Sequence, residues 1–300
     1  MNAKTLLLVT TLAVPSMQCG AAIAISNFTA AGNDRFANSP SFIESGSDFS
    51  GVGRSADGRW VTMISSNVFI SATHYHPADG SNVTFYSGNS TTTPVTRVIS
   101  GSQQIGTTDL WVGYLDSSVG PTIKIYSRVT TSYASSGLAG MPTVMSGISP
   151  TATGYGGSNL TNQAVGTNRV EGFLANQTVD GQTGDAILTF ENQASDSAFG
   201  YTNTTYEAQL AVGDSGGPLF QLSGTNLILA GMNWATGNFD IDPGPATVPR
   251  NFSVYSYVGT SNTAINSYIA THPVPEPSTL FPLVLGLGLI IRRRRDVHAQ

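Results

Sequence analysis

The chain has 300 residues, and its 13 Lys and Arg against 18 Asp and Glu give a formal net charge of −5. An acidic chain of this kind has no electrostatic footprint for nucleic acid, so we expect no nucleic-acid partner. The length suits one domain or two small ones, and the abundance of Gly, Ser, Thr and Asn favours strands joined by turns over long helices.

The N-terminal segment, residues 1–24, has the order of a secretory signal peptide. An early lysine is followed by an apolar core over Leu6–Val14 and by the small-residue cleavage site Ala22-Ile23-Ala24. The single cysteine, Cys19, lies inside this segment, so a chain cleaved after it contains no disulfide. We therefore expect a signal peptidase to remove residues 1–24, and residues 25–273 to form the folded domain.

An apolar run in the first third of the chain ends in a histidine. Residues 64–74 read Ile-Ser-Ser-Asn-Val-Phe-Ile-Ser-Ala-Thr-His, which indicates a strand that delivers His74 at its end. A histidine in such a place can act as a general base near neutral pH. His76 precedes Pro77 and falls outside this pattern, so we interpret it as a solvated turn residue.

The rest of the folded domain also reads as strands. Residues 108–115, Thr-Asp-Leu-Trp-Val-Gly-Tyr-Leu, place Asp109 at the entrance of an apolar strand. Near the end, Ser261 is a candidate cap for a short helix over Asn262–Ala270. The alternating or apolar runs that predict strands are Trp60–Ser65, Val83–Tyr86, Pro94–Ser100, Leu110–Leu115, Thr122–Tyr126, Arg169–Phe173, Ala186–Phe190 and Leu227–Asn233.

The most specific pattern in the chain is Gly-Asp-Ser-Gly-Gly-Pro at residues 213–218. A serine hydroxyl is a poor nucleophile until a base takes its proton, and its attack on a carbonyl creates an oxyanion that needs N–H donors. Gly213 allows the backbone to turn so that the amides of Gly213 and Ser215 point into one hole. The pattern therefore predicts a nucleophilic Ser215 in a preformed anion site.

These three segments, over roughly Phe49 to Ile269, resemble the trypsin-like serine protease family. The resemblance implies a triad in the chain order His74, Asp109, Ser215, in which the aspartate accepts the histidine Nδ1–H and fixes its tautomer. It implies an oxyanion hole formed by Gly213 and Ser215, and a serine endopeptidase acting on protein or peptide substrates without a cofactor. One departure is Tyr75, which stands where the family has a cysteine.

The same resemblance implies an all-β fold of two packed six-stranded antiparallel β-barrels with a short C-terminal helix, the halves meeting near residues 137–141. It places the floor of the substrate pocket six positions before the serine, at Gln209, and a pocket wall at Trp234. A neutral residue at the floor predicts a pocket for an uncharged side chain.

Activation adds a further expectation from the resemblance. Many family members become active when a new N-terminal Ile or Val pairs with the aspartate before the serine. Cleavage after Ala24 exposes Ile25, whose amine would then pair with Asp214. The alternative is that Asp214 finds internal partners and needs no activation.

The motif also allows two other interpretations. Gly213-x-Ser215-x-Gly217 also matches the nucleophile elbow of α/β-hydrolases, with Asp240 or Asp242 and then His272 as formal partners. An elbow joins a strand to a helix, whereas a second strand follows Ser215, so this reading is disfavoured. The alternative to an enzyme is a catalytically silent trypsin-fold binding or matrix protein of the cell surface. The histidines lack a nearby carboxylate cluster, so we expect no metal site.

The C-terminal segment, residues 274–296, carries Val-Pro-Glu-Pro-Ser-Thr, an apolar run over 280–291 and then four arginines. This order resembles the PEP-CTERM sorting signal of Gram-negative bacteria. The apolar run is shorter than the ~20 residues of a comfortable membrane span. The resemblance implies transient inner-membrane anchoring, cleavage by an exosortase-type enzyme, and export to the cell surface or an extracellular matrix.

Overall fold

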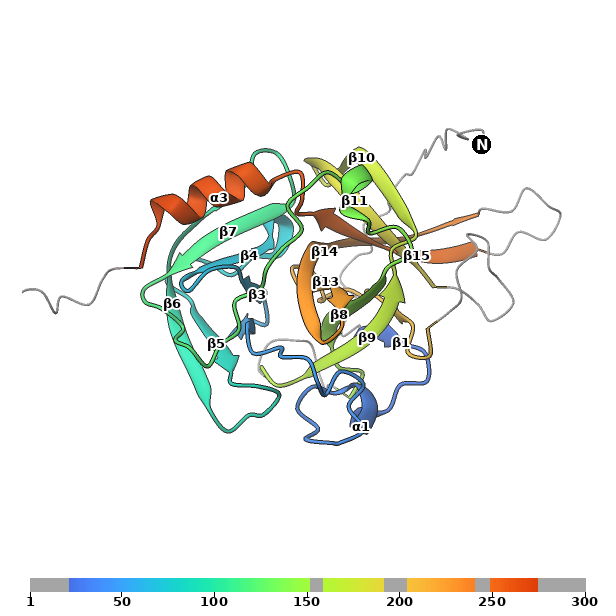
Figure 1. The fold of residues 1–300 in the computed structure, drawn as a ribbon, viewed down its shortest axis with the longest axis horizontal. Helices are drawn as coiled ribbons and strands as arrows, with labels where there is room; N and C mark the ends of the chain where they lie inside the picture. Colours follow the sequence, from blue (N-terminus) through green and yellow to red (C-terminus); the bar gives the residue numbers. More distant parts are fainter. Residues whose placement is uncertain (1–21, 152–158, 192–203, 241–248, 275–300) are drawn as a thin grey trace, which may run out of the picture.

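The computed structural model describes residues 22–151, 159–191, 204–240 and 249–274. Strands make up most of the regular secondary structure, and the helices are short (Figure 1). The helices are α1 (Ala30–Asn33), the 3₁₀ turn η1 (Thr73–Tyr75), α2 (Tyr133–Ser136) and α3 (Asn262–Thr271). The strands are β1 (Ala24–Ile25), β2 (Val52–Ser55), β3 (Trp60–Met63), β4 (Val68–Ala72), β5 (Asn82–Tyr86), β6 (Pro94–Gln104), β7 (Leu110–Leu115), β8 (Pro142–Ile148), β9 (Gln163–Arg169), β10 (Gly172–Val179), β11 (Gln182–Phe190), β12 (Ala208–Gln209), β13 (Pro218–Ser223), β14 (Asn226–Asp240) and β15 (Pro249–Tyr257).

The first half of the fold is a closed antiparallel barrel of six strands in the order β2-β3-β4-β7-β6-β5. Its interior is filled by buried apolar side chains, among them Met63, Phe69 and Phe85. Strand β4 pairs with β7 so that Ala72 faces Leu110. Because the strands are antiparallel, the residues that follow β4 lie beside the residues that precede β7. This register brings η1 next to Asp109.

The second half is a seven-stranded antiparallel sheet in the order β10-β11-β15-β14-β13-β8-β9, accompanied by the two-stranded pair β1-β12. This differs from the second six-stranded barrel expected from the sequence. The β10–β11 hairpin extends one side of the sheet, where β11 pairs with β15 over Ala186–Phe190. The fold is therefore mostly β, with one closed barrel, one larger antiparallel sheet and a short C-terminal helix.

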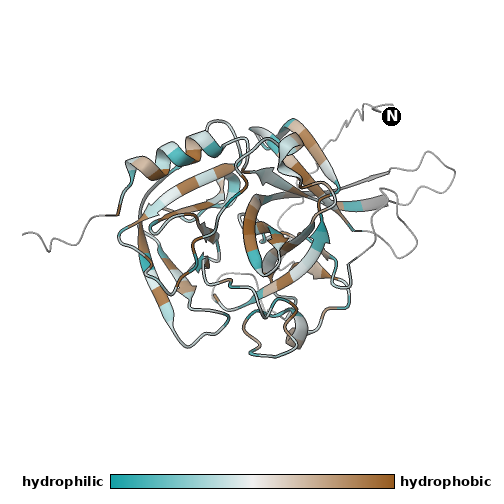
Figure 2. Ribbon diagram, in the orientation of Figure 1, coloured by the Kyte–Doolittle hydropathy of each residue, from teal (hydrophilic) through white to brown (hydrophobic). Residues whose placement is uncertain are grey.

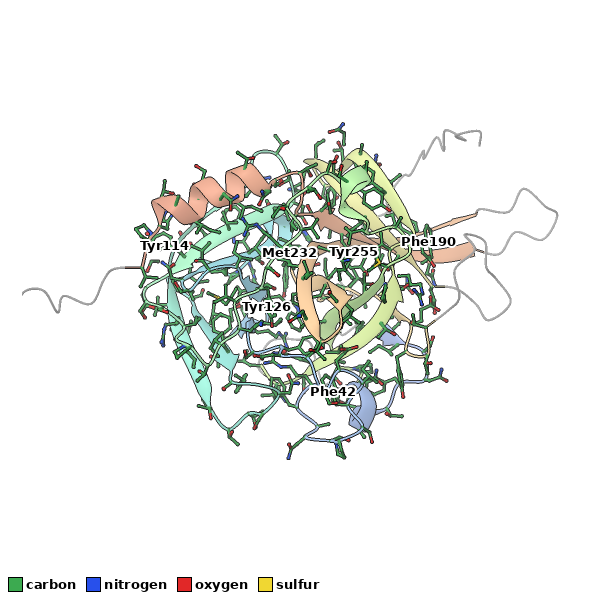
Figure 3. The ribbon with its side chains drawn as sticks, viewed as in Figure 1. Phe42, Tyr114, Tyr126, Phe190, Met232 and Tyr255 are labelled. Atoms are coloured by element: carbon green, nitrogen blue, oxygen red, sulfur yellow. The ribbon has the colours of Figure 1, made fainter. Side chains whose placement is uncertain are left out.

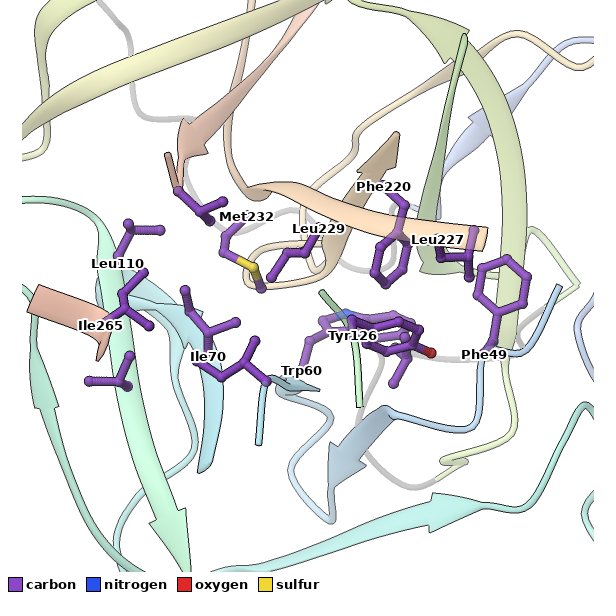
Figure 4. Close-up of a cluster of buried hydrophobic side chains, with 14 of the residues drawn as sticks. Phe49, Trp60, Ile70, Leu110, Tyr126, Phe220, Leu227, Leu229, Met232 and Ile265 are labelled. Atoms are coloured by element: carbon purple, nitrogen blue, oxygen red, sulfur yellow. The ribbon is translucent and has the colours of Figure 1, made fainter. Parts of the chain in front are cut away.

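A single apolar cluster joins the two halves. It includes Trp60 and Ile70 from the barrel, Phe220 and Met232 from the sheet, and Tyr126 from the connection between them (Figure 4). Figure 3 shows Tyr126 and Met232 near the middle of the molecule, whereas Tyr255 and Phe190 lie within the second half. Burial of large side chains across this boundary fixes the orientation of the two halves, because each Å² of apolar surface removed from water contributes ~25 cal/mol of stabilising free energy.

Helix α3 follows β15 of the second half but lies along the barrel (Figure 1). Ile265 and Tyr268 are its buried residues, and they join the cluster between the halves. Asn67 donates its side-chain N–H to the carbonyl of His272 at 3.2 Å, and the His272 ring lies 4.5 Å from that of Tyr114. The C-terminus of the described chain is thus tied to the first half.

Most of the strands predicted from alternation are present, and Figure 2 shows the hydrophilic and hydrophobic bands along them. The helix predicted over Asn262–Ala270 is confirmed, although Ser261 makes no side-chain capping bond. The strand predicted at Thr122–Tyr126 is wrong, because this segment joins no ladder: the Lys124 N–H donates to Ser50 Oγ, and the Tyr126 hydroxyl donates to the carbonyl of Asp48. The strand predicted at Arg169–Phe173 is interrupted at Val170, whose side chain is buried while the chain bends from β9 into β10.

Candidate active site

The structure brings His74 and Asp109 together. His74 lies in η1, directly after β4, and Asp109 directly precedes β7. The Nδ1 atom of His74 lies 2.9 Å from each carboxylate oxygen of Asp109, and the backbone N–H of His74 donates to Oδ1 at 3.0 Å. The carboxylate therefore holds both the ring and the main chain of the histidine. Nδ1 carries the proton in this arrangement, which leaves Nε2 free to accept one.

The burial of the two residues differs. The Asp109 side chain is fully buried, whereas 24% of the His74 side chain is exposed. Burial raises the pKa of Asp109 above its ordinary value, and the hydrogen bonds from His74 oppose this rise. The pair thus consists of a shielded carboxylate that orients an accessible imidazole.

The loop that carries Ser215 is shaped by two glycines with positive φ. Gly213 has a φ of 100° and Gly216 a φ of 78°, which residues with a Cβ rarely adopt. The indole N–H of Trp60 donates to the carbonyl of Gly213 at 3.2 Å. A Cβ on Gly216 would lie 2.9 Å from Ser71 Oγ and 3.2 Å from the carbonyl oxygen of Tyr75. The loop therefore lies directly against the end of β4 and the turn that bears His74.

The donors of this loop are available to a ligand. Within the described residues, the backbone N–H groups of Gly213 and Ser215 make no hydrogen bond, whereas those of Asp214, Gly216 and Gly217 are all paired. Over the same residues, no hydrogen bond joins Ser215 Oγ to His74. Ser215 itself is partly exposed. The two free N–H groups are those expected to bind an oxyanion.

Asn233 holds the loop against β14, and the sequence analysis did not identify it. Gly216 donates to its carbonyl at 2.9 Å, and its own N–H donates to Gly217 at 2.8 Å. Its side-chain Nδ2 donates to the carbonyls of Asp214 at 2.8 Å and Ser146 at 3.2 Å. The only signal in the sequence is its place beside Trp234, which by itself predicts no such role.

Asp214 turns away from Ser215 into the second half. It is fully buried, accepts the N–H of Ile148 at 2.6 Å and that of Ala211 at 2.9 Å, and burial raises its pKa to about 7. A Cβ on Gly147 would lie 2.6 Å from its Oδ1 and 2.7 Å from the Cβ of Ile23. Ile23 is also buried and donates its N–H to Ile148 at 3.0 Å.

The residue beside Asp214 is therefore Ile23 and not Ile25, which was the expectation from cleavage after Ala24. Ile25 lies in β1, where it pairs with Ala208 of β12. Ile23 and Ile25 are separated by a single residue, and their packing distinguishes them.

The two pocket residues expected from the sequence have different surroundings. Gln209 is partly exposed and pairs with Ala24 in the small β1–β12 sheet. Trp234 is only 4% exposed and packs in a cluster with Phe190 and Phe252. Glu207, two residues before Gln209, is also buried.

A metal site and a membrane-spanning helix are both absent from the described residues. They contain no group of three or more His, Cys, Asp or Glu side chains placed to hold a metal. None of the helices in this part of the chain has the length and apolar character needed to cross a bilayer. Most of the expected signal peptide, the expected sorting signal with its segment 280–291, and the elbow candidate Asp242 lie outside these residues.

The fold is that of the trypsin-like, or chymotrypsin, class. A mutant of human heparin binding protein matches this structure with a TM-score of 0.51 and 15% sequence identity, over 76% of this chain and 95% of that chain. Human heparin binding protein itself gives a TM-score of 0.49 at the same identity and coverage. No protein-family model matches the chain. No curated protein matches it either.

Proposed function

We propose that this protein is a serine endopeptidase in which Ser215 is the nucleophile, His74 the general base and Asp109 the group that orients it. The observation that carries the proposal is the hydrogen bonding of His74 Nδ1 to the buried carboxylate of Asp109 at 2.9 Å, beside the loop of Ser215. A fold of this class is usually a peptidase, but 15% identity supports the fold alone.

In the proposed reaction, Ser215 Oγ attacks the carbonyl carbon of a peptide bond while its proton passes to His74 Nε2. The resulting oxyanion is bound by the N–H groups of Gly213 and Ser215. His74 then gives the proton to the leaving amine, and an acyl-enzyme remains. Water attacks this ester with His74 again as base, and His74 then returns the proton to Ser215 Oγ as the carboxylic acid product leaves.

The proposal also includes export: the N-terminal segment would act as the signal peptide and the C-terminal segment as the sorting signal of a bacterial surface or matrix protein. The signal peptidase would cut after Ala22, because Gly20-Ala21-Ala22 has small residues at the required positions and Ile23 is built into the fold. The new ammonium group of Ile23 would then lie beside the carboxylate of Asp214. Specificity belongs to the same proposal: the neutral Gln209 favours an uncharged substrate side chain.

Labelling with a fluorophosphonate probe tests the proposal. The chain beginning at Ile23 should be labelled, and Ser215→Ala and His74→Ala should each abolish labelling. Ser223→Ala is the matched control, because Ser223 is exposed at the end of β13 and should leave labelling unchanged. A folded protein that is not labelled would overturn the proposal.

The second candidate is a catalytically silent binding protein of the same fold. It is favoured by one observation, the lack of a hydrogen bond between Ser215 Oγ and His74 among the described residues. The ligand in the name of the human heparin binding proteins does not carry over, because a formal net charge of −5 disfavours a polyanion. Absence of labelling in a folded chain with a free Ile23 would support this candidate.

A further inference from the structure

The turn that bears His74 is held without a covalent link. The chain has one cysteine, at position 19, so no intrachain disulfide can form. Strand β4 ends at Ala72, and the turn that carries His74 is the single short 3₁₀ segment η1, Thr73–Tyr75, followed by His76 in an extended conformation. The side chains that fix the turn must therefore do so by packing and hydrogen bonds.

Arg59, the residue directly before β3, contacts this turn. Its Nη1 donates to the carbonyl oxygen of His76 at 2.5 Å, and its guanidinium carbon lies 4.9 Å above the ring of Tyr75. Its Nε also faces Asp57 at 2.9 Å, but the two side chains are 35% and 50% exposed, so this ion pair contributes little. The bond to His76 and the contact with Tyr75 are the ones that reach the turn.

His76 is held from the other side by β7. Its ring stacks on Trp111 with a centroid distance of 3.7 Å and an angle of 12°. The sequence predicts a solvated ring, but the ring is half-buried. This burial lowers the pKa of His76. The Arg59 guanidinium also lowers the pKa of the ring, whereas the hydrogen bond from Nδ1 to the carbonyl oxygen of Pro77, at 3.0 Å, raises it.

We propose that Arg59 is a positioning residue for His74, acting through Tyr75 and His76 to fix the turn against β3 while Trp111 fixes it against β7. This inference rests on the proposed function of His74. Tyr75 contacts Arg59, His76 contacts both Arg59 and Trp111, and Asp109 holds the imidazole of His74 itself. Without Arg59, the turn would lose its link to β3, and the imidazole would move relative to Ser215.

The test compares Arg59→Gln, Arg59→Lys and the matched control Arg97→Gln in the chain beginning at Ile23. Arg97 lies on β6 of the same barrel and bonds the carbonyls of Thr96 and Ser118, away from η1. Two quantities are measured: the second-order rate of fluorophosphonate labelling against pH, and the NMR titration of His74 with its Nδ1 proton resonance. Urea unfolding shows that each variant is folded.

Arg59→Gln should lower the labelling rate by ~10- to 100-fold, the loss expected when a catalytic group is displaced by about 1 Å. It should also change the midpoint of the His74 titration and broaden the Nδ1 proton resonance. Arg59→Lys should recover part of the rate, because an ammonium group can still donate to the His76 carbonyl and lie over the Tyr75 ring. Arg97→Gln should match the wild type in both measurements.

Unchanged labelling and an unchanged His74 titration in Arg59→Gln would overturn the inference. The same is true if Arg97→Gln produced equal effects, since these would then reflect the general loss of an arginine. If the wild type is not labelled at all, the proposed function fails instead. The NMR titration then decides the inference alone, because it reports the setting of His74 without any reaction.

Discussion

The burial of the Asp214 carboxylate predicts that the N-terminus controls how the free energy of unfolding depends on pH. Burial raises the pKa of Asp214 from 3.8 to about 7. Below that pH, the folded chain with an uncut N-terminus therefore favours the protonated carboxyl group. Because the folded chain binds this proton more tightly than the unfolded chain, protonation stabilises the fold. This contribution is fully present below the pKa of the unfolded chain and is lost as the pH rises through the pKa of the folded chain. At 1.36 kcal/mol per pKa unit, the unfolding free energy should fall by about 4 kcal/mol between pH 4 and pH 7.

A free ammonium group at Ile23 would remove this loss, because a cation beside the carboxylate favours its ionised form. The experiment therefore compares the chain that begins at Ile23 with a longer chain that begins at Gly20. Urea unfolding followed by tryptophan fluorescence from pH 4 to 8 gives the free energies. The extended chain should lose the stated stability with rising pH, and the chain beginning at Ile23 should lose much less.

Asp214→Asn in the extended chain is the control. It should remove the pH-dependent fall and should cost about 1–3 kcal/mol at low pH, because the amide cannot accept from both Ile148 and Ala211. Equal pH profiles for the two wild-type chains would refute the proposed pairing of Ile23 with Asp214. A fall that persists in Asp214→Asn would show that another group is responsible.

Three shorter predictions concern the site and its frame. Asp109→Asn should lower fluorophosphonate labelling by ~10⁴-fold with little change in fold by circular dichroism, because an amide favours the wrong imidazole tautomer of His74. Gly216→Ala should abolish labelling and lower the melting temperature, since the new methyl would lie 2.9 Å from Ser71 Oγ at a φ of 78°; unchanged labelling would contradict this. Ile265→Ala should cost about 2–5 kcal/mol in urea unfolding, because this fully buried side chain joins α3 to the core between the halves.

The sequence allowed His74 and Asp109 to be chosen because each stands next to a strand with a clear apolar pattern. Their meeting depends on the pairing of β4 with β7, which is non-local, but both patterns give the strand ends correctly. Ser215 was chosen from its glycines, and the positive φ of Gly213 and Gly216 agrees with that choice.

Other features could not be read from the sequence, because alternation reports burial and not the partner that causes it. Tyr126 is buried as the pattern of Thr122–Tyr126 requires, but its hydroxyl bonds the carbonyl of Asp48 and no ladder forms there. The number of strands in the second half depends on where the β10–β11 hairpin docks. The sequence predicts a solvated His76, which is wrong because its stacking partner, Trp111, comes from a separate strand, β7.

The position of helix α3 has a mechanical consequence. The helix leaves the second half, yet its last residues are fixed to the barrel, where the His272 ring lies 4.5 Å from Tyr114 and 4.1 Å from Tyr268. A pull on the chain beyond Val274 is therefore resisted first by aromatic stacking and by the bond from Asn67, and not by any strand of the seven-stranded sheet. In a protein tethered by its C-terminus, the load would therefore reach the barrel that carries His74 before it reaches the sheet whose strand β13 follows the loop of Ser215.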